Sequence, residues 1–179
     1  MHIKTKLAAP LAAAAFLISA CQNMATAEAD KINDLQIAHI AYTADVIDIR
    51  YAHLALAISD DPAVREFAEL MLRDHTAVNE GALALLAKLN VAPEDNPTSQ
   101  SLLSQAATKR SELAQLSGSA FDKAYAENEL AYHQFVNAAV EGTFIPATQN
   151  GELKEFLTVA LATFQAHEAH AEMMVDDLK

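Results

Sequence analysis

The sequence predicts an all-α protein, an up-down four-helix bundle with one additional short helix. Of the 179 residues, 52% are hydrophobic, which is too apolar for a disordered chain. The chain has only 4 glycines and 5 prolines, too few turn formers for an all-β protein. Along four long segments, apolar residues recur at alternating steps of three and four, which gives each helix one packing face. Four such helices of comparable length are typical of a bundle.

The first two long helices are predicted over residues 33–59 and 62–91. The first has an apolar seam along one face. The seam residues are Ile37, Ile40, Ala44, Ile47, Tyr51, Leu54 and Ile58. The segment "SDDP" ends this helix, because Asp61 can cap the next helix and Pro62 suits its first position, where the missing N–H costs little.

The second half of the chain predicts a short helix and two long ones. The short helix, over residues 99–116, is more polar and should lie across the end or the side of the bundle. The next helix spans residues 120–141, with Ser119 and Asp122 as a capping pair and Gly142 as its C-terminal stop. A loop leads to the last helix, over residues 151–178.

Residues 1–20 have the pattern of a signal peptide of the lipoprotein type. Lys4 and Lys6 precede a run of fourteen apolar residues, which is too short to span a bilayer. The run ends in "ISAC", where the sulfur of Cys21, the single cysteine of the chain, would receive a lipid. The alternative is ordinary cleavage after Ala27. We therefore expect a tether over residues 21–32 and a bundle domain over residues 33–178.

The expected location is the cell envelope, with the protein facing the periplasm and attached to the membrane through lipid on Cys21. Gln22 follows in place of an aspartate, which favours the outer membrane; cleavage after Ala27 would instead release a soluble periplasmic protein. Loss of Lys4 and Lys6 from the 12 basic residues leaves 10 against 24 acidic ones, a net charge of −14. Such a surface repels nucleic acid, and the sequence names no protein partner.

Histidines interrupt the apolar faces of three predicted helices. His75 and His167 stand at seam positions, where the pattern calls for a leucine. His133 lies at the edge of an apolar face, and Glu129 is one turn earlier on the same side. His39 and His53, by contrast, fall opposite the seam of the first helix, so we expect them to face solvent. His75, His133 and His167 are therefore the candidates for a buried polar layer.

The depth of each side chain along the bundle can be estimated by counting residues from the turns. Asp48 and His75 lie about 12 and 14 residues from the first turn, so they share a level within roughly 3 Å. His133 is 9 residues before Gly142, whereas His167 is 16 after Gly151. This count places Glu129 nearer to the level of His167 and leaves the depth of His133 open.

Two interpretations of this layer stay open. Imidazoles and carboxylates from facing helices suit zinc, copper or iron, with His75, His133 and His167 as ligands and Asp48 or Glu129 as a fourth ligand or as a group that orients a ligand. The same residues can also form a metal-free hydrogen-bond network. A single metal site requires the side chains of His75 and His167 to lie within about 6 Å, given metal–nitrogen distances of about 2.1 Å.

A di-iron centre is not expected, because such centres use two Glu-x-x-His pairs and this chain offers neither. "ENELAYH" spaces Glu129 and His133 by four residues, and "HEAH" lacks the spacing of the zinc-protease motif. There is no spare thiol nucleophile, and no serine has an evident base. We therefore predict no catalytic residue and no organic cofactor.

Three stretches resemble the bacterial domain of unknown function 4142: "DDPAVREFAELMLRDHTAVNE", "LSGSAFDKAYAENELAYHQFV" and "LKEFLTVALATFQAHEAHAEMM". The positions that match the family pattern are Asp74, His75, Asn79, Phe121, Asp122, Tyr125, His133 and His167. The resemblance covers residues 33–178 and implies a ferritin-like helical bundle exported to the envelope, without a known activity. The first helix departs from the family, which often has two glutamates where this chain has Asp48 and Arg50.

The leading hypothesis is a non-catalytic envelope lipoprotein whose buried His/Asp layer binds a transition metal. The alternative is a structural or protein-interaction module whose histidines form a metal-free network. A redox or hydrolytic enzyme is a third and weaker hypothesis, because it needs an open metal position and a pocket.

Overall fold

The computed structural model describes residues 32–179, and every regular element among them is helical. The elements are α2 (Asp34–Ile58), α3 (Pro62–Lys88), α4 (Pro97–Leu113), α5 (Gly118–Ala139), η1 (Val140–Phe144), α6 (Ile145–Ala147) and α7 (Gly151–Asp177). The all-α prediction is therefore confirmed. The predicted signal peptide over residues 1–20, and with it Cys21 and Ala27, lies outside the described residues.

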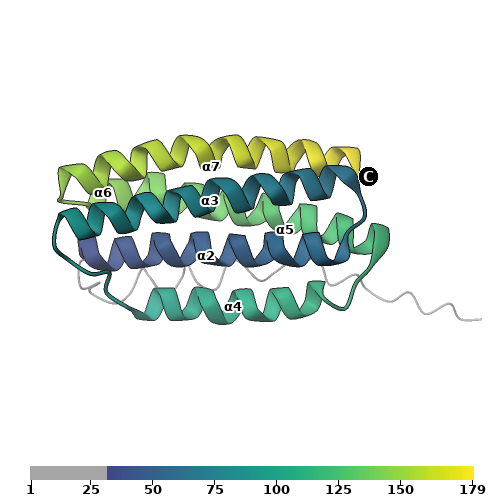
Figure 1. Ribbon diagram of the computed structural model, residues 1–179, viewed down its shortest axis with the longest axis horizontal. Coiled ribbons are helices and arrows are strands. Elements are labelled where there is room, and N and C mark those ends of the chain that lie inside the picture. The colour runs from purple at the N-terminus through teal and green to yellow at the C-terminus, as the bar shows by residue number, and fades with distance from the viewer. Residues whose placement is uncertain (1–31) are drawn as a thin grey trace, which may run out of the picture. The chain divides into compact units, whose positions relative to one another are not determined.

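Four long helices lie side by side, and α4 runs along the outer side of α2 (Figure 1). α2 packs against α3 and α5, and α7 also packs against both of these helices. The short helix was predicted to lie across the end or the side of the bundle, and it occupies the side. Its Ser99 hydroxyl lies 2.8 Å from Nδ1 of His39. The prediction that His39 faces solvent is therefore wrong, because α4 half-buries it, whereas His53 is exposed as expected.

Side-chain caps set most of the helix starts. The Asp61 carboxylate accepts from the backbone N–H groups of residues 63 and 64, and Pro62 takes the first helical position, as the sequence predicted. The side chains of Asn33, Asn96 and Asn150 cap α2, α4 and α7 in the same way. These caps satisfy backbone donors that have no partner within the helix.

Two predicted boundaries are wrong. Ser119 does not cap α5, which begins earlier at Gly118, and the Asp122 carboxylate instead accepts a hydrogen bond from the Ser59 hydroxyl at the end of α2. Gly142 does not stop the helix, because the chain continues through η1 into α6. Burial of Val140 and Phe144 in the core outweighs the small cost of a glycine inside a helix, about 1 kcal/mol.

The apolar core has two parts, one toward each end of the molecule. One contains Phe67, Met71 and Tyr125, and the other contains Leu86 and Leu157. Along α3, His75 falls between Met71 of the first part and Leu86 of the second. The polar layer therefore lies between two apolar clusters, which shield it from water along the bundle axis.

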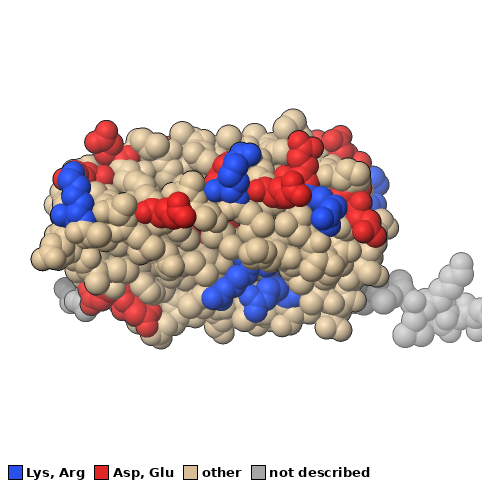
Figure 2. Space-filling model, viewed as in Figure 1, with Lys and Arg blue, Asp and Glu red and all other residues tan. Residues whose placement is uncertain are grey.

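The surface of the bundle carries charges of both signs. In the view of Figure 2, acidic and basic side chains lie interspersed over α3 and α7, and a further basic group lies over α4. None of the helices in residues 32–179 is both long enough and apolar enough to cross a membrane.

Candidate metal centre

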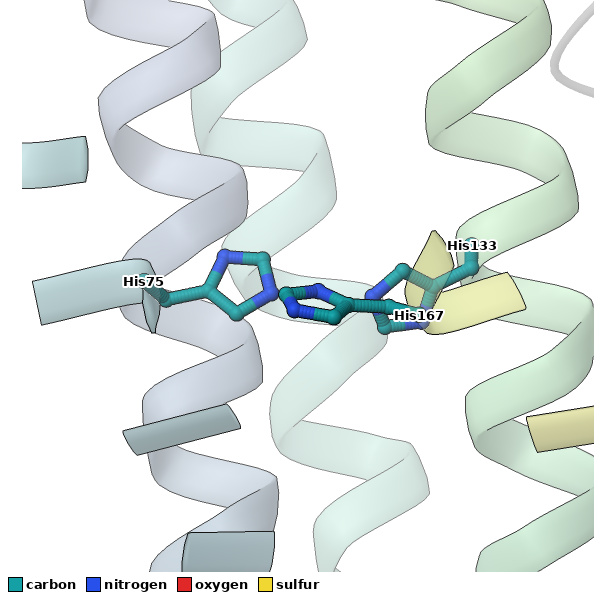
Figure 3. A group of neighbouring side chains, drawn as sticks. All are labelled: His75, His133 and His167. Carbon is teal, nitrogen blue, oxygen red and sulfur yellow. The ribbon is translucent and has the colours of Figure 1, made fainter. Parts of the chain in front are cut away.

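Three imidazole rings from three different helices meet in one layer. His75 comes from α3, His133 from α5 and His167 from α7, and the three residues are 3%, 1% and 2% exposed. The ring centroids are 5.2 Å apart for His75 and His167, 5.4 Å for His133 and His167, and 5.7 Å for His75 and His133 (Figure 3). One potential ligand atom from each residue lies within 4.8 Å of the others. The distance that a single metal site requires between His75 and His167 is therefore met.

Helix α2, the remaining long helix of the bundle, contributes Asp48, which is fully buried. Its Oδ2 lies 3.1 Å from Nε2 of His75 and 3.3 Å from Nε2 of His133. Asp48 and His75 share a level, as residue counting predicted, and His133 joins them. Each of the four helices α2, α3, α5 and α7 thus places one candidate ligand in the layer.

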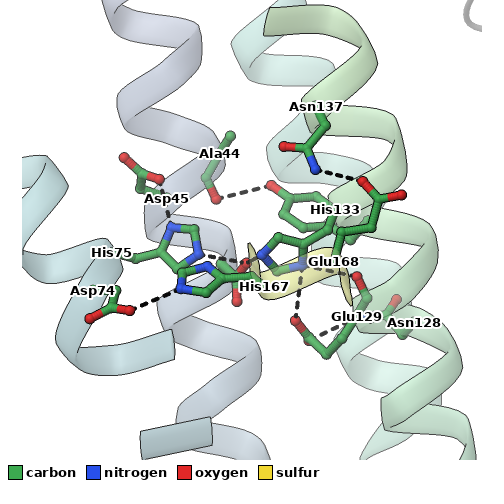
Figure 4. Close-up of polar contacts among 12 residues, drawn as sticks. Ala44, Asp45, Asp74, His75, Asn128, Glu129, His133, Asn137, His167 and Glu168 are labelled. Atoms are coloured by element: carbon green, nitrogen blue, oxygen red, sulfur yellow. Dashed lines mark hydrogen bonds and ion pairs between the residues drawn. The ribbon is translucent and has the colours of Figure 1, made fainter. Parts of the chain in front are cut away.

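The other nitrogen of each ring is held by a partner outside the layer (Figure 4). Nδ1 of His75 lies 2.7 Å from Oδ1 of Asp45. Nδ1 of His133 lies 3.0 Å from the backbone carbonyl of Glu129. Nε2 of His167 lies 3.0 Å from Oδ2 of Asp74. Metal-binding histidines are usually held in this way, because the outer partner fixes the tautomer and turns the second nitrogen toward the ion.

The ligand atoms of the layer have no well-aligned hydrogen-bond partner, although Oδ2 of Asp48 lies within ion-pair distance of two ring nitrogens. They are Nε2 of His75, Nε2 of His133, Nδ1 of His167 and both carboxylate oxygens of Asp48. Leaving a buried polar atom unsatisfied costs about 1–3 kcal/mol, and native interiors contain few such atoms. Their gathering in the core is an arrangement that could hold a metal ion.

Glu129 belongs to a second group of donors that overlaps the first. One potential ligand atom each from Asp48, Glu129 and His133 lies within 4.8 Å of the others. Glu129 is fully buried, and its Oε2 has no hydrogen-bond partner. This oxygen is 4.0 Å from Nδ1 of His133. The structure thus places the five predicted site residues in two groups that overlap at His133.

The charges of the layer are distributed unequally. Burial opposes the charged form of His75, but Asp48 and Asp45 together raise its pKa to about 10. Burial also opposes ionisation of Asp48, yet His75 and His133 lower its pKa to about 2. Burial lowers the pKa of His133 and brings that of His167 to about 4. Near neutral pH, two of the three imidazoles are therefore neutral and carry free lone pairs.

Sequence analysis missed two residues of the site. Asp45 precedes Asp48 by three residues and so lies on the same face of α2, a spacing that could have revealed it. Asp74, next to His75 in the sequence, is the second, and its carboxylate reaches His167 on the neighbouring helix α7. His170 lies outside the layer, with its ring edge-on to Phe67 at 5.2 Å. Arg50 is exposed, which agrees with its lack of a role in the site.

A narrow gap reaches the layer between α2 and α5. The residues that line it are Ala44, Asp45, Asp48, His75, Tyr132, His133 and Val136. The Tyr132 hydroxyl donates to the Ala44 carbonyl at 2.9 Å and thereby joins the two helices across this gap. The gap has no room for a free water molecule.

The fold and the site together define a helical-bundle protein with a buried histidine and carboxylate layer. Residues 19–174 match the sequence model of the domain of unknown function DUF4142, so the chain belongs to this family. The resemblance that the motifs indicated is therefore confirmed. No curated protein and no solved structure matches the chain.

Proposed function

We propose that this protein is a non-catalytic metal-binding protein of the cell envelope. It holds one transition-metal ion through the imidazoles of His75, His133 and His167, with Asp48 as the fourth ligand, and the ion displaces the proton that Asp48 and Asp45 otherwise keep on His75. The observation that carries the proposal is the difference between the inner and the outer atoms of the layer. The inner ligand atoms make no well-aligned hydrogen bond, only ion-pair contacts of 3.1 Å and 3.3 Å through Oδ2 of Asp48, while the outer nitrogen of each ring is held by a carboxylate or a backbone carbonyl.

Three imidazole nitrogens and a carboxylate oxygen form a donor set that suits zinc, copper or iron. In a tetrahedral zinc site with bonds of about 2.0–2.1 Å, ligand atoms lie about 3.4 Å apart. The 3.1 Å and 3.3 Å separations between Asp48 and two of the ring nitrogens are close to this value. Side-chain adjustment, with little backbone movement, would complete the shell.

The four long helices fit a ferritin-like up-down four-helix bundle, with α4 as the additional helix. The neighbour pattern supports this assignment, since α2 and α7 each pack against both α3 and α5. In such bundles, metal sites are built in the core from residues on facing helices.

The proposed location is the periplasmic face of the outer membrane, with a lipid on Cys21 as the anchor. The sequence "ISAC" at the end of an apolar run supports this proposal. Membrane fractionation of cells that express the full chain tests it. Wild-type protein should stay with the membranes, and a Cys21→Ser variant should not. If wild-type protein is recovered in the soluble periplasmic fraction, cleavage after Ala27 becomes the better account.

The metal proposal is tested by adding zinc, copper or ferrous iron to the tag-free protein and measuring the bound metal. Wild-type protein should bind one equivalent. The His75→Ala, His167→Ala double variant should bind none at the same free-metal concentration. His53→Ala, which changes an exposed histidine on α2, serves as the control and should bind like wild type. Equal binding by the double variant and the wild type would disprove the site.

The alternative function is a structural or interaction module with a metal-free histidine network. One observation favours it: Asp48 and Asp45 flank a charged His75, which forms an ion-paired cluster without any metal. The two functions differ in how the protein melts. An ion that binds only the folded state raises the melting temperature, and a chelator abolishes the increase. A melting temperature that neither metal nor chelator changes would favour the structural module.

A further inference from the structure

We propose that Glu129 is a fifth protein ligand, so that the centre binds a divalent transition-metal ion in a five-coordinate shell of three nitrogens and two carboxylate oxygens. This inference rests on the proposed metal site and specifies its coordination. It predicts that Fe²⁺, Mn²⁺ and Co²⁺ bind with five protein donors, and that Cu⁺ is a poor occupant.

The first support is the position of Glu129. Its group of donors shares His133 with the three-imidazole group, and it includes Asp48, whose Oδ2 lies 3.1 Å from Nε2 of His75 and 3.3 Å from Nε2 of His133. Two ligands on opposite sides of one ion, each with a bond of about 2.1 Å, are about 4.2 Å apart. The three donors lie within 4.8 Å of one another, so a small side-chain adjustment brings them to that span. An ion bound by His133 and Asp48 is therefore within reach of Glu129.

The second support is that the Glu129 carboxyl has another carboxyl group, Asp48, as its neighbour and no lysine or arginine of the described chain to neutralise it. The residue is fully buried, and its Oε2 accepts no hydrogen bond. The other oxygen has one long contact, 3.5 Å from Nδ2 of Asn128. Among residues 32–179, no lysine or arginine forms an ion pair with it. A buried carboxyl group in this state costs stability unless it is paired or bound to a cation.

The third support is the balance of charge inside the first shell. Asp48 and Glu129 carry two negative charges when both bind an ion, and the three imidazoles are neutral as ligands. A divalent ion makes this shell neutral, whereas a monovalent ion leaves one unbalanced negative charge in a buried place. Buried net charge is costly, so the shell favours a divalent ion. Oxygen donors also disfavour Cu⁺, which prefers sulfur ligands.

Titration with Co²⁺ tests the inference, because the visible absorption of Co²⁺ depends on its coordination number. Four-coordinate Co²⁺ absorbs several-fold more strongly than five-coordinate Co²⁺. The proteins to compare are wild type, Glu129→Gln and a matched control, Glu127→Gln, whose side chain is exposed on the same helix. We expect the weaker five-coordinate spectrum for wild type and for Glu127→Gln. For Glu129→Gln we expect the stronger four-coordinate spectrum and an affinity at least about tenfold lower.

X-ray absorption on Co²⁺-loaded wild-type protein gives a second measurement that does not depend on a variant that folds. It should count five nitrogen and oxygen neighbours in the first shell. A four-coordinate wild-type spectrum, or an unchanged spectrum and affinity in Glu129→Gln, would overturn the role of Glu129 while the three-histidine site remained valid. If wild-type protein binds no Co²⁺, zinc, copper or iron, the proposed function itself fails.

Discussion

Nδ1 of His75 lies 2.7 Å from Oδ1 of Asp45, and both side chains are about 95% buried. This contact joins α3 to α2 and fixes the rotation of the imidazole, so that Nε2 faces the centre of the layer. The same ring is stacked on Phe164 at a centroid distance of 5.0 Å and an interplanar angle of 9°. His75 is thus held on an edge and on a face before any ion binds, and its inner nitrogen needs little reorganisation to serve as a ligand.

Asp45→Asn should weaken metal binding without removing a ligand. The amide keeps the shape of the side chain but removes the negative charge that makes the ring a better donor. Loss of such an outer partner typically lowers metal affinity by about 10–100-fold. Competition with a chelator of known affinity measures the change. An affinity equal to that of wild type would mean that Asp45 does not orient His75.

Asp74→Asn should have a smaller effect on metal affinity, below about tenfold. The Asp74 side chain is 23% exposed and is shared between Nε2 of His167 and Nε of Arg73, so solvent screens its charge. Nitrogen NMR chemical shifts of the histidine rings, recorded with and without Zn²⁺, should show a change confined to His167. An effect larger than that of Asp45→Asn would contradict the ranking that burial predicts.

The stability of the metal-free protein should decrease as the pH rises from about 6.5 to about 10. The pKa of His75 is about 10 in the folded protein, well above the usual 6.5, because Asp48 and Asp45 outweigh its burial. The folded state therefore binds the His75 proton more tightly than the unfolded state does. The resulting stabilisation is complete below pH 6.5 and is lost as the pH rises toward 10, at a rate of at most about 1.4 kcal/mol per pH unit.

Urea unfolding in the presence of a chelator at several pH values measures this loss. His75→Gln should be less stable than wild type at pH 7 and should lack this decrease at higher pH. If both proteins lose the same stability between pH 7 and pH 10, groups other than His75 are responsible.

Phe67→Ala should destabilise the bundle by about 3–5 kcal/mol. The Phe67 ring is completely buried and packs edge-on against Tyr125 and His133, with centroid distances of 6.3 Å and 6.5 Å. Its removal leaves a cavity next to the histidine layer. Val159→Ala is the control, because Val159 is 66% exposed and its truncation should change stability by less than about 0.5 kcal/mol. Denaturant unfolding of both variants gives the comparison, and equal losses would contradict the assigned core.

The helices could be predicted because their signals are local. The steps of three and four, the Asp61 cap and Pro62 at the start of α3 depend only on neighbouring residues. The depth of His133 could not be settled because it depends on where a helix ends. The chain continues through η1 to Ala147, so His133 is 14 residues before that end and His167 is 16 after Gly151. The two histidines then share a level within about 3 Å.

The sequence by itself determined the helices, the family and the residues that interrupt the apolar seams. Only the tertiary structure decided that His75, His133, His167 and Asp48 meet at one point, and that Asp45 and Asp74 hold two of the rings from outside. The physical reason is that helix periodicity fixes the direction of a side chain relative to its own axis. Its partner depends on the rotation and axial offset of the neighbouring helix, which only the packing of the whole core sets.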